Sequence, residues 1–138
     1  MEFLALLENF RLGPPLSDIA SLIARIILGV TFIYYGHFKW KDLKQNAKDF
    51  DEIHGLRPGW LFGTLVAFQE FFGGIFVILG LLTPVFALGF VVHMTSGATW
   101  KVTKTDKPFT DWSYDLLALG LSLLLLITGP GAYALDLF

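Results

Sequence analysis

The chain has 138 residues, of which 54% are hydrophobic and 16% charged, with a net charge of −2 and a mean hydropathy of +0.62. Because a soluble domain is about 45–50% apolar and about 25% charged, this composition favours a single membrane domain. The chain has no basic patch for nucleic acid, and the lack of cysteine excludes disulfides, thiolate metal sites and a Cys-x-x-Cys redox pair.

The N-terminal stretch, residues 1–16, differs from a cleavable signal because it lacks a basic start. Its short apolar run ends at Gly13-Pro14-Pro15. We expect it to form a short interfacial or surface segment.

Four apolar windows approach the roughly 20 residues that a membrane-spanning helix needs. They cover residues 19–38, 61–82, 84–100 and 114–128. Backbone groups in hydrocarbon must be bonded within their own segment, and the windows lack the alternating pattern of strands. The sequence therefore predicts an all-α, integral membrane four-helix bundle. The alternative is a soluble helical bundle with an unusually apolar core.

The connection after the first window has a helical pattern of its own. Leu43, Ala47, Phe50 and Ile53 recur at helical spacing among charged residues. This predicts an amphipathic helix over about residues 42–54 that lies in the membrane interface. A solvated helical loop is the alternative.

The tryptophans and the positive charges predict the orientation in the membrane. We expect all four tryptophans at one interface, beside the ends of the spans: Trp40, Trp60, Trp100 and Trp112. Lysines and arginines gather in the same connections, residues 39–60 and 101–113. The positive-inside rule places these connections in the cytoplasm and both termini outside, in a multi-pass protein of the cell membrane.

Ionisable residues within the spans are the candidates for function: Arg25, Glu70, His93 and Asp115, with Lys39 at the end of the first span. Each charge near the bilayer centre costs at least about 2.5–3.5 kcal/mol, so such residues usually pair in the bundle interior. A rise of about 1.5 Å per residue puts Glu70 and His93 near the midplane, within reach of the long Arg25 side chain. This predicts a deep pair of Arg25 with Glu70, joined by His93, and a shallow pair of Lys39 with Asp115.

These residues can be interpreted as structural or as functional. An Arg–Glu pair can fix helix order, a single histidine can be a satisfied interhelical hydrogen bond, and an aspartate suits a helix start. The functional interpretation is a small polar cavity for a ligand or a proton. No second histidine faces His93 at its depth, and there is no Glu-x-x-His pair for a di-iron site, so we expect neither haem nor metal.

Short motifs in the right order resemble the DoxX family of small four-helix membrane proteins. The matching pieces are Arg25, Gly29 and Gly36-His37-Phe38-Lys39, then Glu70-Phe71-Phe72-Gly73-Gly74 and Leu79-Gly80-Leu81-Leu82-Thr83-Pro84, then Tyr114-Asp115 and Gly129-Pro130-Gly131-Ala132-Tyr133-Ala134-Leu135-Asp136. The family often has glutamate where this chain has Asp115, which changes the reach of that carboxylate.

The resemblance implies similarity to the membrane subunit of thiosulfate:quinone oxidoreductase, which passes electrons from a sulfur compound to quinone. We therefore expect an oxidoreductase subunit that binds quinone or a small anion. Glu70 and His93 are its expected catalytic residues, and Arg25, Lys39 and Asp115 its expected ligand-binding residues. The alternatives are a non-catalytic scaffold or assembly subunit, and a small proton-linked transporter. The expected partners are the lipid bilayer, other membrane or peripheral subunits, and further copies of the chain.

Overall fold

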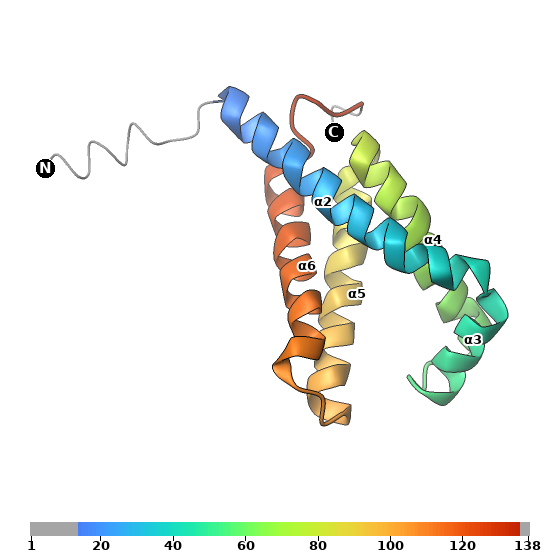
Figure 1. Cartoon of the computed structure of the whole chain (residues 1–138). Helices are drawn as coiled ribbons and strands as arrows, with labels where there is room; N and C mark the ends of the chain where they lie inside the picture. Colours follow the sequence, from blue (N-terminus) through green and yellow to red (C-terminus); the bar gives the residue numbers. More distant parts are fainter. Residues whose placement is uncertain (1–13, 136–138) are drawn as a thin grey trace, which may run out of the picture.

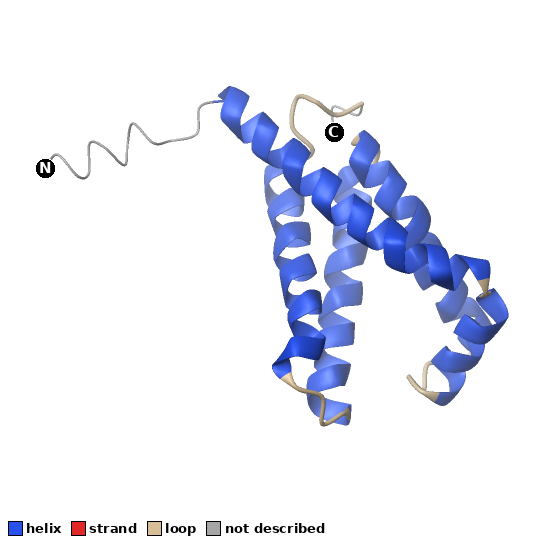
Figure 2. Ribbon diagram, in the orientation of Figure 1, coloured by secondary structure: helices blue, strands red, loops and turns tan. Residues whose placement is uncertain are grey.

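The structure is a computed structural model that describes residues 14–135. Most of the expected interfacial segment at residues 1–16 therefore lies outside the described residues. Five α-helices and no strand make up the described part (Figures 1 and 2). In chain order they are α2 (Pro14–Lys41), α3 (Leu43–Glu52), α4 (Gly59–Leu79), α5 (Thr83–Lys104) and α6 (Phe109–Thr128).

Three of these helices are long and apolar enough to cross a membrane: Leu16–Lys41 within α2, and the whole of α4 and α6. Large apolar side chains stay exposed along them, such as Leu117 at 71% and Ile127 at 81%, as expected of faces that contact lipid. The all-α membrane fold is confirmed. Helix α5 has 22 residues but is not among the helices of sufficient hydropathy, so its crossing as a fourth span stays a prediction.

The predicted windows coincide closely with helices. Residues 19–38, 84–100 and 114–128 lie within α2, α5 and α6. The window 61–82 runs past α4, which ends at Leu79 because Gly80 takes the left-handed conformation with φ 71°.

Helix α2 crosses α4 obliquely and at close range (Figure 1). The contact depends on glycines that lack a side chain at the crossing. A Cβ added to Gly74 would lie 2.7 Å from the Gly29 carbonyl oxygen, and one added to Gly36 would lie 2.7 Å from Glu70 Cβ. Small residues allow such close approach of membrane helices. Deeper in the core, Phe32 of α2 stacks on Phe90 of α5 with ring centroids 3.8 Å apart.

Replacing Gly74 with alanine should separate α2 from α4. The new methyl group would meet backbone, which cannot rotate away, so we expect a loss of about 1–3 kcal/mol in the free energy of unfolding. Gly120→Ala is the matched control, because a Cβ there meets nothing within 4 Å. Denaturant unfolding in lipid nanodiscs would measure both variants. Equal stability of the two would contradict the close crossing.

Helix α3 packs antiparallel along the first turns of α4. Asn46 Nδ2 donates a hydrogen bond of 2.6 Å to the Gly63 carbonyl, and Asp51 Oδ1 accepts one of 2.8 Å from the Gly59 N–H. Asn46 and Phe50 are buried, which ties this helix to α4. Its expected position in the membrane interface stays a prediction.

The expectation that all four tryptophans share one level is wrong for Trp40. Its ring lies 5.0 Å from that of Phe72 and 6.4 Å from that of Phe68. Between Trp60 and Phe72, α4 rises by about 18 Å. Because α2 is oblique and the chain continues down α4 as α3, the end of the first span lies deeper than a straight bundle would place it.

Candidate functional site

Glu70 is the centre of a charged cluster between three helices. Its Oε1 accepts a hydrogen bond of 2.6 Å from Lys39 Nζ of α2, and His93 Nε2 of α5 lies 3.5 Å from the same oxygen. The Glu70 side chain is only 4% exposed. The structure thus brings together three of the predicted site residues, Lys39, Glu70 and His93, and we call them the Glu70 cluster.

Local sequence explains this geometry. Gly36 allows the α2 backbone to approach Glu70, and Lys39 follows three residues later on the same helix face. Its ammonium group then reaches the carboxylate while its side chain is 34% exposed. From Gly59, α4 rises about 16 Å to Glu70, so the ion pair lies well inside the span.

A second ion pair lies beside the Glu70 cluster. Lys101 Nζ is 2.7 Å from Asp115 Oδ2 and also donates to the Asp111 carbonyl at 3.2 Å. The Asp115 side chain is 5% exposed. Gly97 lies against it, since a Cβ there would be in van der Waals contact with Asp115 Oδ1 at 3.5 Å. Gly97 is one turn from His93 on α5, so the Lys101–Asp115 pair is a neighbour of the Glu70 cluster.

The predicted shallow pair of Lys39 with Asp115 is therefore wrong. Lys39 lies too deep, because α2 is oblique, and Asp115 takes Lys101 as its partner instead. Sequence reasoning missed Lys101 because it assigned this residue to a loop, whereas α5 continues to Lys104. The antiparallel order of α5 and α6 was the signal that could have paired them.

The predicted pair of Arg25 with Glu70 is also wrong. The Arg25 side chain is fully buried and donates from Nη1 to the Ile78 carbonyl at 3.0 Å and from Nη2 to the Tyr133 carbonyl at 2.9 Å. Ile78 lies about 12 Å along α4 from Glu70. Helix ends leave carbonyl groups without intrahelical partners, and the guanidinium satisfies one at the end of α4. Arg25 thus stands apart from the Glu70 cluster.

Arg25 belongs to a clamp that holds residues 129–135 over this end of the bundle. Two further bonds complete it: the Leu135 N–H donates to the Leu79 carbonyl at 3.1 Å, and the Ala132 N–H donates to Asp18 Oδ1 at 3.0 Å. The part of the C-terminal motif up to Leu135 is therefore a structural element. Asp136 lies outside the described residues.

Two atoms of the Glu70 cluster, Glu70 Oε2 and His93 Nδ1, are buried and have no hydrogen-bond partner among residues 14–135. A buried polar atom left unpaired costs about 1–3 kcal/mol. Such atoms are where a small polar ligand or a water molecule would gain hydrogen bonds. Within residues 14–135, no group of three or more acidic or histidine side chains is arranged to hold a metal ion.

His54, which follows α3, lies outside the spans and contacts residues of both α3 and α5. Its ring centroid is 5.1 Å from that of Phe50 and 4.7 Å from that of Trp100. Partial burial, followed by the positive charge of Lys39, lowers the pKa of His54. The neutral imidazole is therefore favoured at neutral pH, and no second positive charge is added near Lys39.

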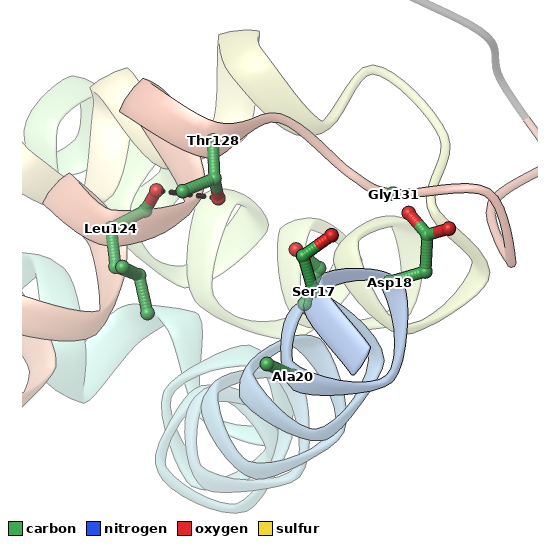
Figure 3. A pocket seen from close by; sticks show the side chains of 7 residues that line it. Ser17, Asp18, Ala20, Leu124, Thr128 and Gly131 are labelled. Atoms are coloured by element: carbon green, nitrogen blue, oxygen red, sulfur yellow. Dashed lines mark hydrogen bonds between the residues drawn. The ribbon is translucent and has the colours of Figure 1, made fainter. Parts of the chain in front are cut away.

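A pocket of about 200 Å³ lies at the other end of the bundle (Figure 3). It is lined by Ser17, Asp18, Ala20, Ser21, Leu124, Thr128 and Gly131. Thr128 Oγ1 donates back to the Leu124 carbonyl at 2.8 Å, and Asp18 is held by the clamp. None of the lining residues belongs to the Glu70 cluster or to the neighbouring Lys101–Asp115 pair, so we do not assign the pocket to the site.

These features define an all-helical membrane protein with two neighbouring ion pairs inside the bundle. The chain belongs to the DoxX family: the DoxX family model matches residues 20–104. It is 32% identical to "Inner membrane protein YqjF" of Escherichia coli (strain K12) over an alignment of 126 positions that covers 88% of this chain and 92% of that protein. It is also 32% identical to "Putative oxidoreductase CatD" of Bacillus subtilis (strain 168) over 122 residues, which are 88% of this chain and 87% of that protein.

No solved structure shows significant similarity to the chain. The resemblance to DoxX proteins seen in the sequence is thus confirmed, and the protein is a multi-pass membrane protein. The matched residues include Lys39, Glu70, His93 and Lys101, whereas Asp115 lies beyond them.

Proposed function

We propose that this protein is the membrane subunit of an oxidoreductase complex, and that the Glu70 cluster binds an oxygen atom of a quinone and exchanges protons with it. The observation that carries this proposal is the pair of buried, unpartnered atoms, Glu70 Oε2 and His93 Nδ1, beside a lysine inside the span. The name of the Bacillus subtilis relative, a putative oxidoreductase, supports this class of activity.

The proposed reaction requires a partner. Reduction of a quinone to the quinol consumes two electrons and two protons, and a chain without cysteine has no thiolate ligands for an iron–sulfur centre. In our proposal, a partner subunit that oxidises a small reductant delivers the electrons. Glu70 or His93, after taking up a proton, delivers it to the quinone oxygen bound at the cluster, and water at the partner subunit supplies the proton for the other oxygen. The Lys39 ammonium stabilises negative charge that develops on the bound oxygen.

In the same proposal, the Lys101–Asp115 ion pair marks the side of the membrane from which protons reach the Glu70 cluster. In the predicted orientation, the connections 39–60 and 101–113 face the cytoplasm. Lys101 and Asp115 lie between that side and His93. Protons consumed at the Glu70 cluster would then come from the cytoplasm.

A scaffold or assembly subunit is the second candidate, and the role of Arg25 favours it. The side chain of this fully buried residue donates from Nη1 and Nη2 to backbone carbonyls. If the Glu70 cluster is equally structural, exchanging the charges of Lys39 and Glu70 should restore function lost in either single variant.

Quinone binding tests the proposal directly. The protein should retain quinone when membranes are solubilised gently and lipids are extracted from the purified protein. In nanodiscs, Glu70→Gln should weaken binding of the short-chain quinone decylubiquinone at least about tenfold, the equivalent of one hydrogen bond to a charged group. Asp111→Asn is the matched control, because that carboxylate is 44% exposed and outside the Glu70 cluster. Absence of quinone, together with equal affinities for wild type and Glu70→Gln, would remove the proposal.

A further inference from the structure

Gln69 is a polar residue of α4 next to Glu70 in the chain. It precedes Glu70 on α4 and faces α5. A Cβ added to Gly89 of α5 would lie 3.1 Å from the carbon, nitrogen and oxygen of the Gln69 amide. Gly89 therefore makes the space that this amide occupies.

The Gln69 amide lies on the same helix interface as the Glu70 cluster. One turn further along α4, Gly73 packs against Phe86 and Phe90 of α5. On α5, His93 follows Gly89 by one turn, about 6 Å. Residues 69, 70 and 73 of α4 thus face residues 86, 89, 90 and 93 of α5.

In the described part of the chain, three buried polar atoms on this interface have no hydrogen-bond partner: Gln69 Nε2, Glu70 Oε2 and His93 Nδ1. The first is a donor, the second an acceptor, and the third is a donor or an acceptor according to the imidazole tautomer. Three such atoms on one helix interface are unusual, because buried polar groups are nearly always paired. An oxygen atom seated among them can accept from the amide and share a proton with the carboxylate or the imidazole.

We propose that Gln69 is a ligand-binding residue whose amide N–H donates a hydrogen bond to the oxygen atom that the Glu70 cluster protonates. This inference rests on the proposed function and adds the group that orients the quinone carbonyl. Gly89 is a positioning residue in this arrangement, since a Cβ there would make the amide shift by a few tenths of an ångström.

The test replaces Gln69 with methionine, which has a similar length and no N–H donor. Decylubiquinone binding to the protein in nanodiscs should weaken about tenfold, and the infrared band of the bound quinone carbonyl should move toward its position in apolar solvent. Gln45→Met is the matched control, because Gln45 is exposed on α3 and its side-chain amide donates to Asp49 of the same helix. It should leave affinity and the infrared band unchanged.

The unfolding midpoint without quinone separates binding from structure. Methionine removes a buried, unpaired donor, so the midpoint of Gln69→Met should stay the same or rise. A fall in both midpoint and affinity would show a packing role and overturn the inference. So would an unchanged affinity, which would mean that these atoms hold a bound water only.

The outcomes for the two proposals are distinct. If wild type binds no quinone, the proposed function fails. If wild type binds quinone and Glu70→Gln weakens binding while Gln69→Met does not, only the role of Gln69 fails.

Discussion

Replacing Arg25 with methionine should lower the free energy of unfolding by about 3 kcal/mol. The substitution removes two hydrogen bonds from a charged donor, each typically contributing about 1.5–3 kcal/mol. Relief of the cost of burying the charge returns part of that loss. The carbonyls of Ile78 and Tyr133 would lose their partner, and residues 129–135 should detach from the end of α4.

Two measurements check the Arg25 variant. Denaturant unfolding in nanodiscs gives the stability, and hydrogen exchange of the Leu135 amide, which donates to Leu79, reports on the clamp. Arg57→Met is the matched control, because Arg57 is exposed. Under conditions where the variant stays folded, quinone binding should persist, since Arg25 binds the Ile78 carbonyl, and Ile78 lies about 12 Å along α4 from Glu70. Loss of binding with unchanged stability would contradict this assignment and favour a ligand-binding role for Arg25.

The Lys39–Glu70 pair should show strong coupling in a double-mutant cycle. Lys39→Met leaves a carboxylate that is 4% exposed without its cation, and breaking a buried pair in this way costs about 3–5 kcal/mol. Glu70→Gln should cost less, because the Lys39 side chain is 34% exposed and can turn toward water. The double variant should be more stable than Lys39→Met alone.

The comparison pair for this cycle is Lys107 and Asp111, whose charged atoms are 3.9 Å apart and whose side chains are 53% and 44% exposed. An exposed pair of this kind contributes only about 0.3–0.5 kcal/mol. Unfolding measurements on all single and double variants give both coupling energies. A coupling at Lys39–Glu70 no larger than that at Lys107–Asp111 would mean that the ion pair does not form in the membrane.

Much of this protein could be predicted from local sequence alone. A run of apolar residues determines a membrane helix regardless of what surrounds it, because the backbone must satisfy its own hydrogen bonds in lipid. The same reasoning identified Glu70 and His93 as deep ionisable residues, since position along a helix follows from the rise per residue. The motifs around Arg25, Lys39 and Glu70 were sufficient to suggest the family.

The partners of the charged residues depended on the tertiary structure. Height along a helix can be counted in the sequence, but the tilt of α2 across α4 cannot, because it results from the packing of Gly29, Gly36 and Gly74. That tilt moves Lys39 down to Glu70 and Trp40 away from the interface. One of the two partners of Arg25, the Tyr133 carbonyl, is in reach only because residues 129–135 fold back over the end of α4. The unpaired Gln69 amide likewise becomes visible only when α5 is placed against α4, since hydrogen-bond partners are a property of neighbours in space.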